Sequence, residues 1–127
     1  MSRLRILTVL LGLSYLSACD NRPVVDRGGG TCSEELVTLR VEVVTAEGVR
    51  VKGATVTATN LETQESITGV TNEVGVSRAV NETLAPGRTR LYATAGSKVS
   101  SSAEVEWECD ECHCQPEPAT VQLQLNP

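Results

Sequence analysis

From Leu36 onward, hydrophobic and polar residues alternate in short runs that are separated by Gly, Asn and Pro. Alternation with a period of two is typical of β-strands that bury one face, and turn residues every 8 to 12 positions or so are typical of an all-β sandwich or barrel. The pattern predicts seven strands, over residues 36–45, 54–59, 65–70, 76–80, 88–95, 99–107 and 120–125. We therefore expect an all-β fold, a seven-stranded antiparallel sandwich of two sheets.

The first two of these strands have the clearest faces. In the first strand Val37, Leu39, Val41 and Val43 fall on one face, opposite Thr38, Arg40 and Glu42. In the second, the inward residues Ala54, Val56 and Ala58 are small, which favours close packing of the sheets. The chain has no Phe, so we expect a core made of Val, Leu, Ile, Ala and Cys.

Three short motifs in the strand region resemble the carboxypeptidase regulatory-like family. They are the string Gly53-Ala54-Thr55-Val56-Thr57-Ala58, the turn Thr71-Asn72-Glu73-Val74-Gly75, and Leu84-Ala85-Pro86-Gly87 followed by Leu91 and Ala93. The aromatic residue usual after the second motif is replaced here by Val76, and immunoglobulin-like repeats of the invasin type share much of the pattern. The resemblance implies a transthyretin-like or immunoglobulin-like sandwich with a binding or structural role, and it implies no catalytic residue.

The N-terminus has the layout of a secretory signal peptide. Two Arg in residues 1–5 precede a mostly apolar run over residues 6–16, which is shorter than the roughly 20 residues of a membrane-spanning helix. Leu16-Ser17-Ala18-Cys19 resembles the lipobox of bacterial lipoproteins. This resemblance implies removal of residues 1–18 and attachment of a diacylglyceryl thioether to Cys19, with acyl chains such as palmitate. The alternative is ordinary cleavage that leaves Cys19 as a thiol.

Residues 19–31 are expected to be the lipidated cysteine and a flexible tether, because they are polar and contain Pro23 and the triplet Gly28-Gly29-Gly30. Residues 32–127 are expected to be the folded domain. A lipid at Cys19 would hold this domain at a membrane of the bacterial cell envelope, facing the periplasm or the exterior. Asp20 resembles the inner-membrane retention signal of enteric bacteria, and the choice between inner and outer membrane stays open.

Charge and composition limit the classes of partner that the protein can bind. The 127-residue chain has 11 basic and 16 acidic side chains, a net charge of −5. Without Arg3 and Arg5 the mature chain would have 9 basic and 16 acidic side chains, or −7. This balance disfavours polyanions, and the few aromatic residues exclude a broad stacking platform, so we expect no nucleic-acid partner.

Four cysteines besides Cys19 predict a disulfide framework in an exported domain. The first and last strands of such sandwiches often run parallel as neighbours, which would bring Cys32 close to Cys114. We therefore favour the pairs Cys32 with Cys114 and Cys109 with Cys112. The alternative pairs are Cys32 with Cys112 and Cys109 with Cys114.

The same cysteines allow a different interpretation, a metal-binding or redox-active lipoprotein. The cluster Cys109, Cys112, His113 and Cys114, together with Cys32, offers ligands at spacings that zinc can use. Zinc ribbons bring a second matching cysteine pair, and the acidic residues around the cluster disfavour a reactive thiolate. We therefore expect no metal and no cofactor, and His113 is expected to be a solvated loop residue.

Glu104, Glu106 and Glu108 fall on one face of a strand, and Val105, Trp107 and Cys109 fall on the other. We expect the acidic face to be in water, where its charges would protect a sheet edge, and Trp107 to be buried against a disulfide. The alternative role for the carboxylates is a weak site for a divalent cation or a basic partner. Tyr92 lies opposite the apolar face of its strand and is expected to be exposed.

No catalytic constellation is recognisable. His113 and Tyr92 are the one His and the one Tyr after the expected signal peptide, and neither a G-x-S-x-G nucleophile motif nor a phosphate-binding loop after a strand is present. We therefore expect a lipid-anchored envelope module that makes protein or glycan contacts and is not an enzyme. Its oligomeric state stays open.

Overall fold

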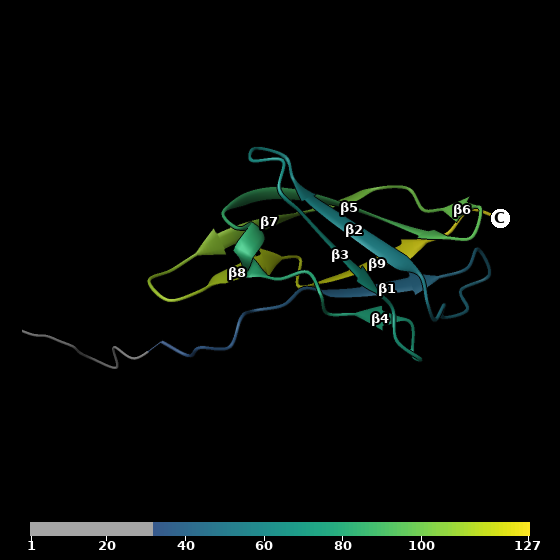
Figure 1. The fold of residues 1–127 in the computed structure, drawn as a ribbon, viewed down its shortest axis with the longest axis horizontal. Coiled ribbons are helices and arrows are strands. Elements are labelled where there is room, and N and C mark those ends of the chain that lie inside the picture. The colour runs from purple at the N-terminus through teal and green to yellow at the C-terminus, as the bar shows by residue number, and fades with distance from the viewer. Residues whose placement is uncertain (1–31) are drawn as a thin grey trace, which may run out of the picture. The chain divides into compact units, whose positions relative to one another are not determined.

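The computed structural model describes residues 32–127, and the compact unit within them spans Glu34–Pro127. The expected signal peptide, Cys19 and the tether up to residue 31 lie outside the described residues. The unit consists of strands joined by turns and a short 3-10 helix, η5 (Glu82–Leu84) (Figure 1). The strands are β1 (Arg40–Val44), β2 (Thr55–Asn60), β3 (Ser66–Val70), β4 (Val76–Ser77), β5 (Gly87–Ala95), β6 (Lys98–Val99), β7 (Ala103–Cys109), β8 (Cys114–Glu117) and β9 (Thr120–Gln124).

The strands form two sheets, as the sequence predicts. One sheet has the order β4-β1-β9, and the other has the order β3-β2-β5-β7-β8, with β6 paired to β5. Neighbouring strands are antiparallel except β1 and β9, which run parallel from the pair Arg40 and Thr120 to the pair Val44 and Gln124. The expectation that the first and last strands are parallel neighbours is confirmed.

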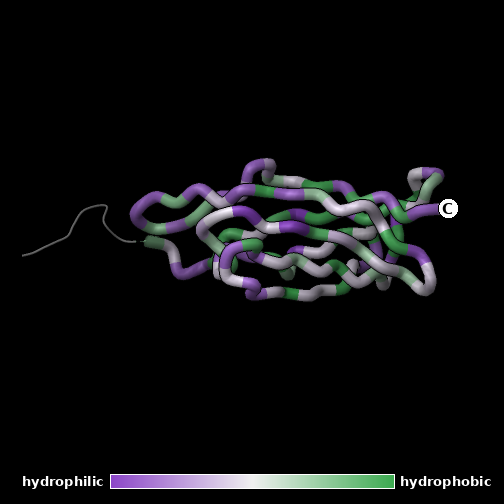
Figure 2. The backbone as a smooth tube through the Cα atoms, turned by 90° about the horizontal axis from the view of Figure 1, so that it is seen from above, coloured by the Kyte–Doolittle hydropathy of each residue, from purple (hydrophilic) through white to green (hydrophobic). Residues whose placement is uncertain are grey.

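The core lies between the two sheets and has the predicted faces. Leu39, Val41 and Val43 of the first strand region are fully buried. Ala54, Val56 and Ala58 on the facing sheet are also fully buried, as are Leu91 and Ala93 of β5. Figure 2 shows hydrophobic and hydrophilic residues alternating along the strands, which is the period of two that places one face in the core.

The predicted turn at residues 72–75 has the expected geometry. The carboxamide oxygen of Asn72 accepts hydrogen bonds from the backbone N–H groups of Val74 and Val76, at 3.0 and 3.1 Å. Gly75 has φ +75°, a conformation that glycine adopts without steric cost. This turn joins β3 to β4 and therefore carries the chain from one sheet to the other.

The single strand expected over residues 99–107 is divided into β6 and β7. The hydroxyl of Ser100 accepts the hydrogen bond of the Ala93 N–H at 2.9 Å, where a regular ladder would use a backbone carbonyl. Ser100 itself pairs with Leu125 beyond the end of β9, so the interruption connects the two sheets. A further strand, β8, is absent from the sequence prediction and forms a hairpin with β7.

Candidate functional site

The sequence-predicted cysteine cluster lies on the β7–β8 hairpin, where Cys109 and Cys114 are opposite each other. Their sulfur atoms are bonded, and their Cα atoms are 3.8 Å apart. In the turn between them, the carboxylate of Asp110 accepts hydrogen bonds from the backbone N–H groups of Cys112 and His113, both at 2.8 Å. These two hydrogen bonds, chiefly the one from His113, hold the pKa of Asp110 below its ordinary value.

The disulfide between Cys109 and Cys114 shows that the predicted pairing of Cys32 with Cys114 and of Cys109 with Cys112 is wrong. The favoured pairing rested on the parallel arrangement of the first and last strands, which is present. However, Cys114 starts β8 rather than a loop leading into β9, and antiparallel pairing with β7 places it directly across from Cys109. Cys32 and Cys112 are each disulfide-bonded as well.

The carboxylate of Glu82, in η5, joins three segments at this end of the sandwich. It accepts hydrogen bonds from the Val37 N–H at 2.6 Å, from Nδ1 of His113 at 2.7 Å and from the Cys114 N–H at 2.9 Å. The bond from Val37 is the main cause that lowers the pKa of Glu82, and partial burial opposes it without cancelling it. Sequence reasoning missed Glu82, because nothing in the local sequence indicates contacts so distant along the chain.

His113 is therefore more than a solvated loop residue, which corrects the expectation. Only 19% of its side chain is exposed, and its Nδ1 is an ion-pair distance from Glu82. Because a carboxylate only accepts hydrogen bonds, Nδ1 carries the hydrogen of this contact. The hydrogen bond between His113 and Glu82 therefore holds the β7–β8 hairpin against η5.

The metal interpretation requires a cluster of ligands. Within residues 32–127, no group of three or more His, Cys, Asp or Glu side chains is arranged to hold a metal ion. The sulfurs of Cys109 and Cys114 are bonded to each other and are not thiolates in this state.

The acidic residues of β7 are exposed on one face, as expected, but they do not lie on a sheet edge. β7 lies between β5 and β8, so the expected edge protection by these residues is wrong. Glu104 pairs with Arg90 at 2.9 Å and with Arg88 at 3.7 Å. Glu106 is directly opposite Glu117 of β8, an arrangement of like charges that is unfavourable without a partner.

Of the two aromatic side chains of the domain, Trp107 is buried and Tyr92 is exposed, as predicted, whereas the packing of Trp107 against a disulfide stays a prediction. Trp107 is 3% exposed, and its Nε1–H donates to the hydroxyl of Thr89 at 3.1 Å. Its neighbour on β8 is Pro116. Tyr92 is 40% exposed on the outer face of β5. Cys109, expected on the buried face with Trp107, is instead exposed at the end of β7.

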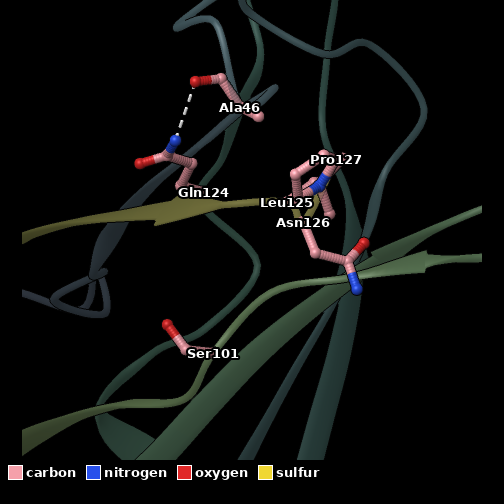
Figure 3. Close-up of a pocket in the computed structure, with 6 residues that line it drawn as sticks. All are labelled: Ala46, Ser101, Gln124, Leu125, Asn126 and Pro127. Atoms are coloured by element: carbon pink, nitrogen blue, oxygen red, sulfur yellow. Dashed lines mark hydrogen bonds between the residues drawn. The ribbon is translucent and has the colours of Figure 1, made fainter.

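A shallow pocket of about 330 Å³ opens at the end of the sandwich that is remote from the β7–β8 hairpin (Figure 3). Its lining consists of Ala46, Ser101, Gln124, Leu125, Asn126 and Pro127. The carboxamide of Gln124 donates to the carbonyl of Ala46 at 2.9 Å along one side. The lining side chains are uncharged, so they provide no acid or base. The sequence did not indicate this pocket, because its lining comes from separate segments.

No protein-family model matches the chain, and no curated protein matches it. Among the described residues, no helix has the length and apolar character needed to cross a membrane.

Proposed function

We propose that this chain is a lipid-anchored protein of the bacterial cell envelope whose sandwich binds a protein or glycan partner and performs no catalysis. The lipid would be attached to Cys19, and residues 20–31 would tether the domain to the membrane surface. At about 5 to 6 Å times the square root of the residue number, such a tether reaches about 20 Å. The partner would therefore be found close to the membrane.

The observation that carries this proposal is the bonded pair Cys109 and Cys114 on the exposed β7–β8 hairpin. Disulfides persist in oxidising compartments such as the bacterial periplasm and are rare in the cytosol. The bond therefore supports export, which the signal-like N-terminus and the lipobox-like Leu16-Ser17-Ala18-Cys19 indicate independently.

The shape of the domain supports a binding role. Sandwiches recognise partners through their loops and through exposed strand edges, which a rigid core holds in place. The resemblance to the carboxypeptidase regulatory-like family points in the same direction, because its members are accessory modules for folding, adhesion or contact with carbohydrates and peptides.

The intact mass of the protein extracted from membranes with detergent tests the proposal. We expect a mature N-terminus at Cys19 with the added mass of acyl chains, and four cysteines that react with an alkylating agent only after reduction. Cys19→Ala should abolish the acyl mass and release the protein from the membrane fraction. An unlipidated wild-type chain would contradict the anchor.

Stoichiometric zinc in protein purified without chelator, with four thiols that titrate in denaturant, would instead support the metal-binding alternative. A function in binding would fail if crosslinking of the anchored protein in intact envelopes recovered no reproducible partner.

A further inference from the structure

The outer face of the β4-β1-β9 sheet carries arginines around a single carboxylate. Val41 and Val43 of β1 are fully buried in the core. Arg40 and Glu42 alternate with them along the strand and therefore lie on the outer face. Nε of Arg40 donates to the carboxylate of Glu42 at 2.9 Å, and the guanidinium of Arg50 is 3.6 Å from the same carboxylate. Two guanidinium groups thus share one negative charge.

A third arginine, Arg78, lies on the same face. The side chains before and after it point toward β3, because a Cβ placed on Gly69 would be 2.9 Å from the hydroxyl of Ser77 and 2.3 Å from the Cβ of Ala79. Arg78 therefore points the opposite way, out of the core, and it is exposed. Continuation of the antiparallel register between β1 and β4 places it beside Arg40. Within residues 32–127, Arg78 forms no ion pair.

The outer face of the larger sheet has the opposite charge. Two arginines and four glutamates of β5, β7 and β8 are exposed there: Arg88, Arg90, Glu104, Glu106, Glu108 and Glu117. This part of the larger sheet therefore has an excess of negative charge. We call Arg40, Arg50, Arg78 and Glu42 on the smaller sheet the basic face, because its three cations exceed its one carboxylate. The two outer faces of the sandwich thus differ in the sign of their charge.

This separation of charge allows an anionic surface to bind one face of a protein whose net charge is −5. Packed sheets are about 10 Å apart, and the Debye length at physiological ionic strength is about 8 Å. A surface in contact with the basic face is therefore attracted by that face more strongly than it is repelled by the acidic face behind it. A lipid surface is the anionic partner closest at hand, because the tether would hold the domain within about 20 Å of a membrane. The described chain also enters the sandwich at β1, the central strand of the sheet that carries the basic face (Figure 1).

We propose that the basic face binds the anionic headgroups of the membrane to which the chain is anchored. The guanidinium groups of Arg40, Arg50 and Arg78 would contact lipid phosphates, which suit their planar fork of donors. Each cation near an anionic membrane surface raises the bound fraction relative to the free fraction by about fivefold. Binding in this orientation leaves the outer face of the larger sheet, with Tyr92, open to a partner. The inference rests on the anchor in the proposed function and adds the orientation of the domain.

The test measures the reactivity of arginine side chains in the lipidated wild-type chain, reconstituted into vesicles. Phenylglyoxal, an uncharged reagent, modifies exposed guanidinium groups, and peptide mass spectrometry gives the rate at each arginine. We expect Arg40, Arg50 and Arg78 to react about fivefold more slowly in vesicles that contain phosphatidylglycerol than in vesicles of phosphatidylcholine alone. Arg88 and Arg90, on the opposite face, should react equally fast in both. Added salt should remove the difference, because it screens the attraction.

Two matched double variants separate the basic face from the overall charge. Arg40→Gln with Arg78→Gln and Arg88→Gln with Arg90→Gln each remove two positive charges, from opposite faces. We expect the first pair to abolish the protection of Arg50 by phosphatidylglycerol and the second pair to preserve it. Circular dichroism checks that both variants are folded. If the first pair does not fold, Arg78→Gln alone removes no ion pair and should lower the protection of Arg50 from about fivefold to about twofold.

Equal protection of both faces, or equal rates in the two kinds of vesicle, would overturn the assignment. So would protection of Arg50 in detergent that grows with protein concentration, since the acidic face of a second copy would then cover the basic face. Sedimentation of the vesicles separates this inference from the proposed function. A wild-type chain that sediments with neither kind of vesicle would reject the anchor at Cys19 and the lipid contact with it. A chain that sediments with both and shows no protection would leave the anchor standing and remove the lipid contact alone.

Discussion

At the scale of single residues, Glu82 does the most to organise the end of the sandwich that carries the hairpin. Its carboxylate accepts three hydrogen bonds, and its own N–H donates to the carbonyl of Val37 at 2.9 Å. The segment before β1, η5 and the start of β8 are thus held by one side chain. A charged acceptor is worth more in such contacts than a neutral one.

We predict that Glu82→Gln lowers the free energy of unfolding by about 2 kcal/mol at pH 7, because hydrogen bonds to a charged group are weakened. The pKa of Glu82 is lowered in the folded state, so the carboxylate stabilises the fold above the unfolded value of 4.5. This contribution is lost as the pH falls through the lower folded value. Urea unfolding of both chains between pH 7 and pH 3 should therefore show a difference that shrinks at acidic pH. Glu111→Gln, on the same hairpin, is the control, and a difference independent of pH would contradict the prediction.

Asn60 is a second residue whose side chain is held by specific hydrogen bonds. It is fully buried, its Nδ2 donates to the carbonyls of Leu84 and Pro86, and its Oδ1 accepts from the N–H groups of Glu62 and Thr63. We predict that Asn60→Asp destabilises the fold by about 3 kcal/mol at pH 7, because an oxygen would face two carbonyls in a buried site.

Asn72→Asp is the matched control for this substitution in denaturant unfolding. The side chain of Asn72 uses only its oxygen, as an acceptor in the β3–β4 turn, so the same substitution should change stability by less than about 0.5 kcal/mol. Equal losses of stability in the two variants would show that the two hydrogen bonds donated by Nδ2 of Asn60 are unimportant.

At the scale of elements, Gly69 permits the close approach of β3 to the segment that follows β4. A Cβ at this position would be 2.3 Å from the Cβ of Ala79 and 2.9 Å from the hydroxyl of Ser77. We predict that Gly69→Ala costs about 2 kcal/mol, the typical effect of overpacking a contact that cannot yield. Because the clash is with Ala79, the double variant Gly69→Ala with Ala79→Gly should recover part of the loss. If the losses of stability from the two substitutions were additive in this double-mutant cycle, the clash with Ala79 would not be the cause of the destabilisation.

The elements that could be predicted from the sequence are those with a strong local signal. Leu39, Val41 and Val43 alternate with polar residues because only one face of β1 is buried, and the turn at Asn72 is made by its own side chain. β8 carries no such signal, since its sequence Cys-Gln-Pro-Glu has one buried residue, Pro116. Its pairing with β7 is a property of the hairpin, and missing it led to the wrong disulfide.

The candidate sites could be predicted less completely than the strands, because less of their arrangement is encoded in a local sequence pattern. The acidic face of β7 follows from alternation, but the position of β7 inside the sheet depends on β8. The contact between Glu82 and His113 joins residues 31 positions apart. Such features depend on tertiary pairing, which a local pattern does not specify.

At the scale of the whole molecule, the four cysteines Cys32, Cys109, Cys112 and Cys114 are all disulfide-bonded. Cys109 and Cys114 are bonded to each other, so of the three pairings that these four cysteines allow, the one that is left would join Cys32 to Cys112. We expect non-reducing peptide mapping to find this second bridge. It would close a loop of about 80 residues, whereas the bridge on the hairpin closes a loop of six.

The two bridges should therefore contribute differently to stability, because the entropy that a crosslink removes from the unfolded chain grows with loop length. The chain-entropy relation gives about 4.5 kcal/mol for the long loop and about 2 kcal/mol for the short one. We predict that Cys32→Ser with Cys112→Ser lowers the thermal unfolding midpoint more than Cys109→Ser with Cys114→Ser, and that reduction of the wild type lowers it at least as much as the first pair. Calorimetry of the three oxidised chains and of the reduced wild type checks this order. Equal midpoints for the two double variants would mean that loop closure is not what the bridges contribute, and a midpoint unaffected by reduction would show that the Val-rich core is sufficient without them.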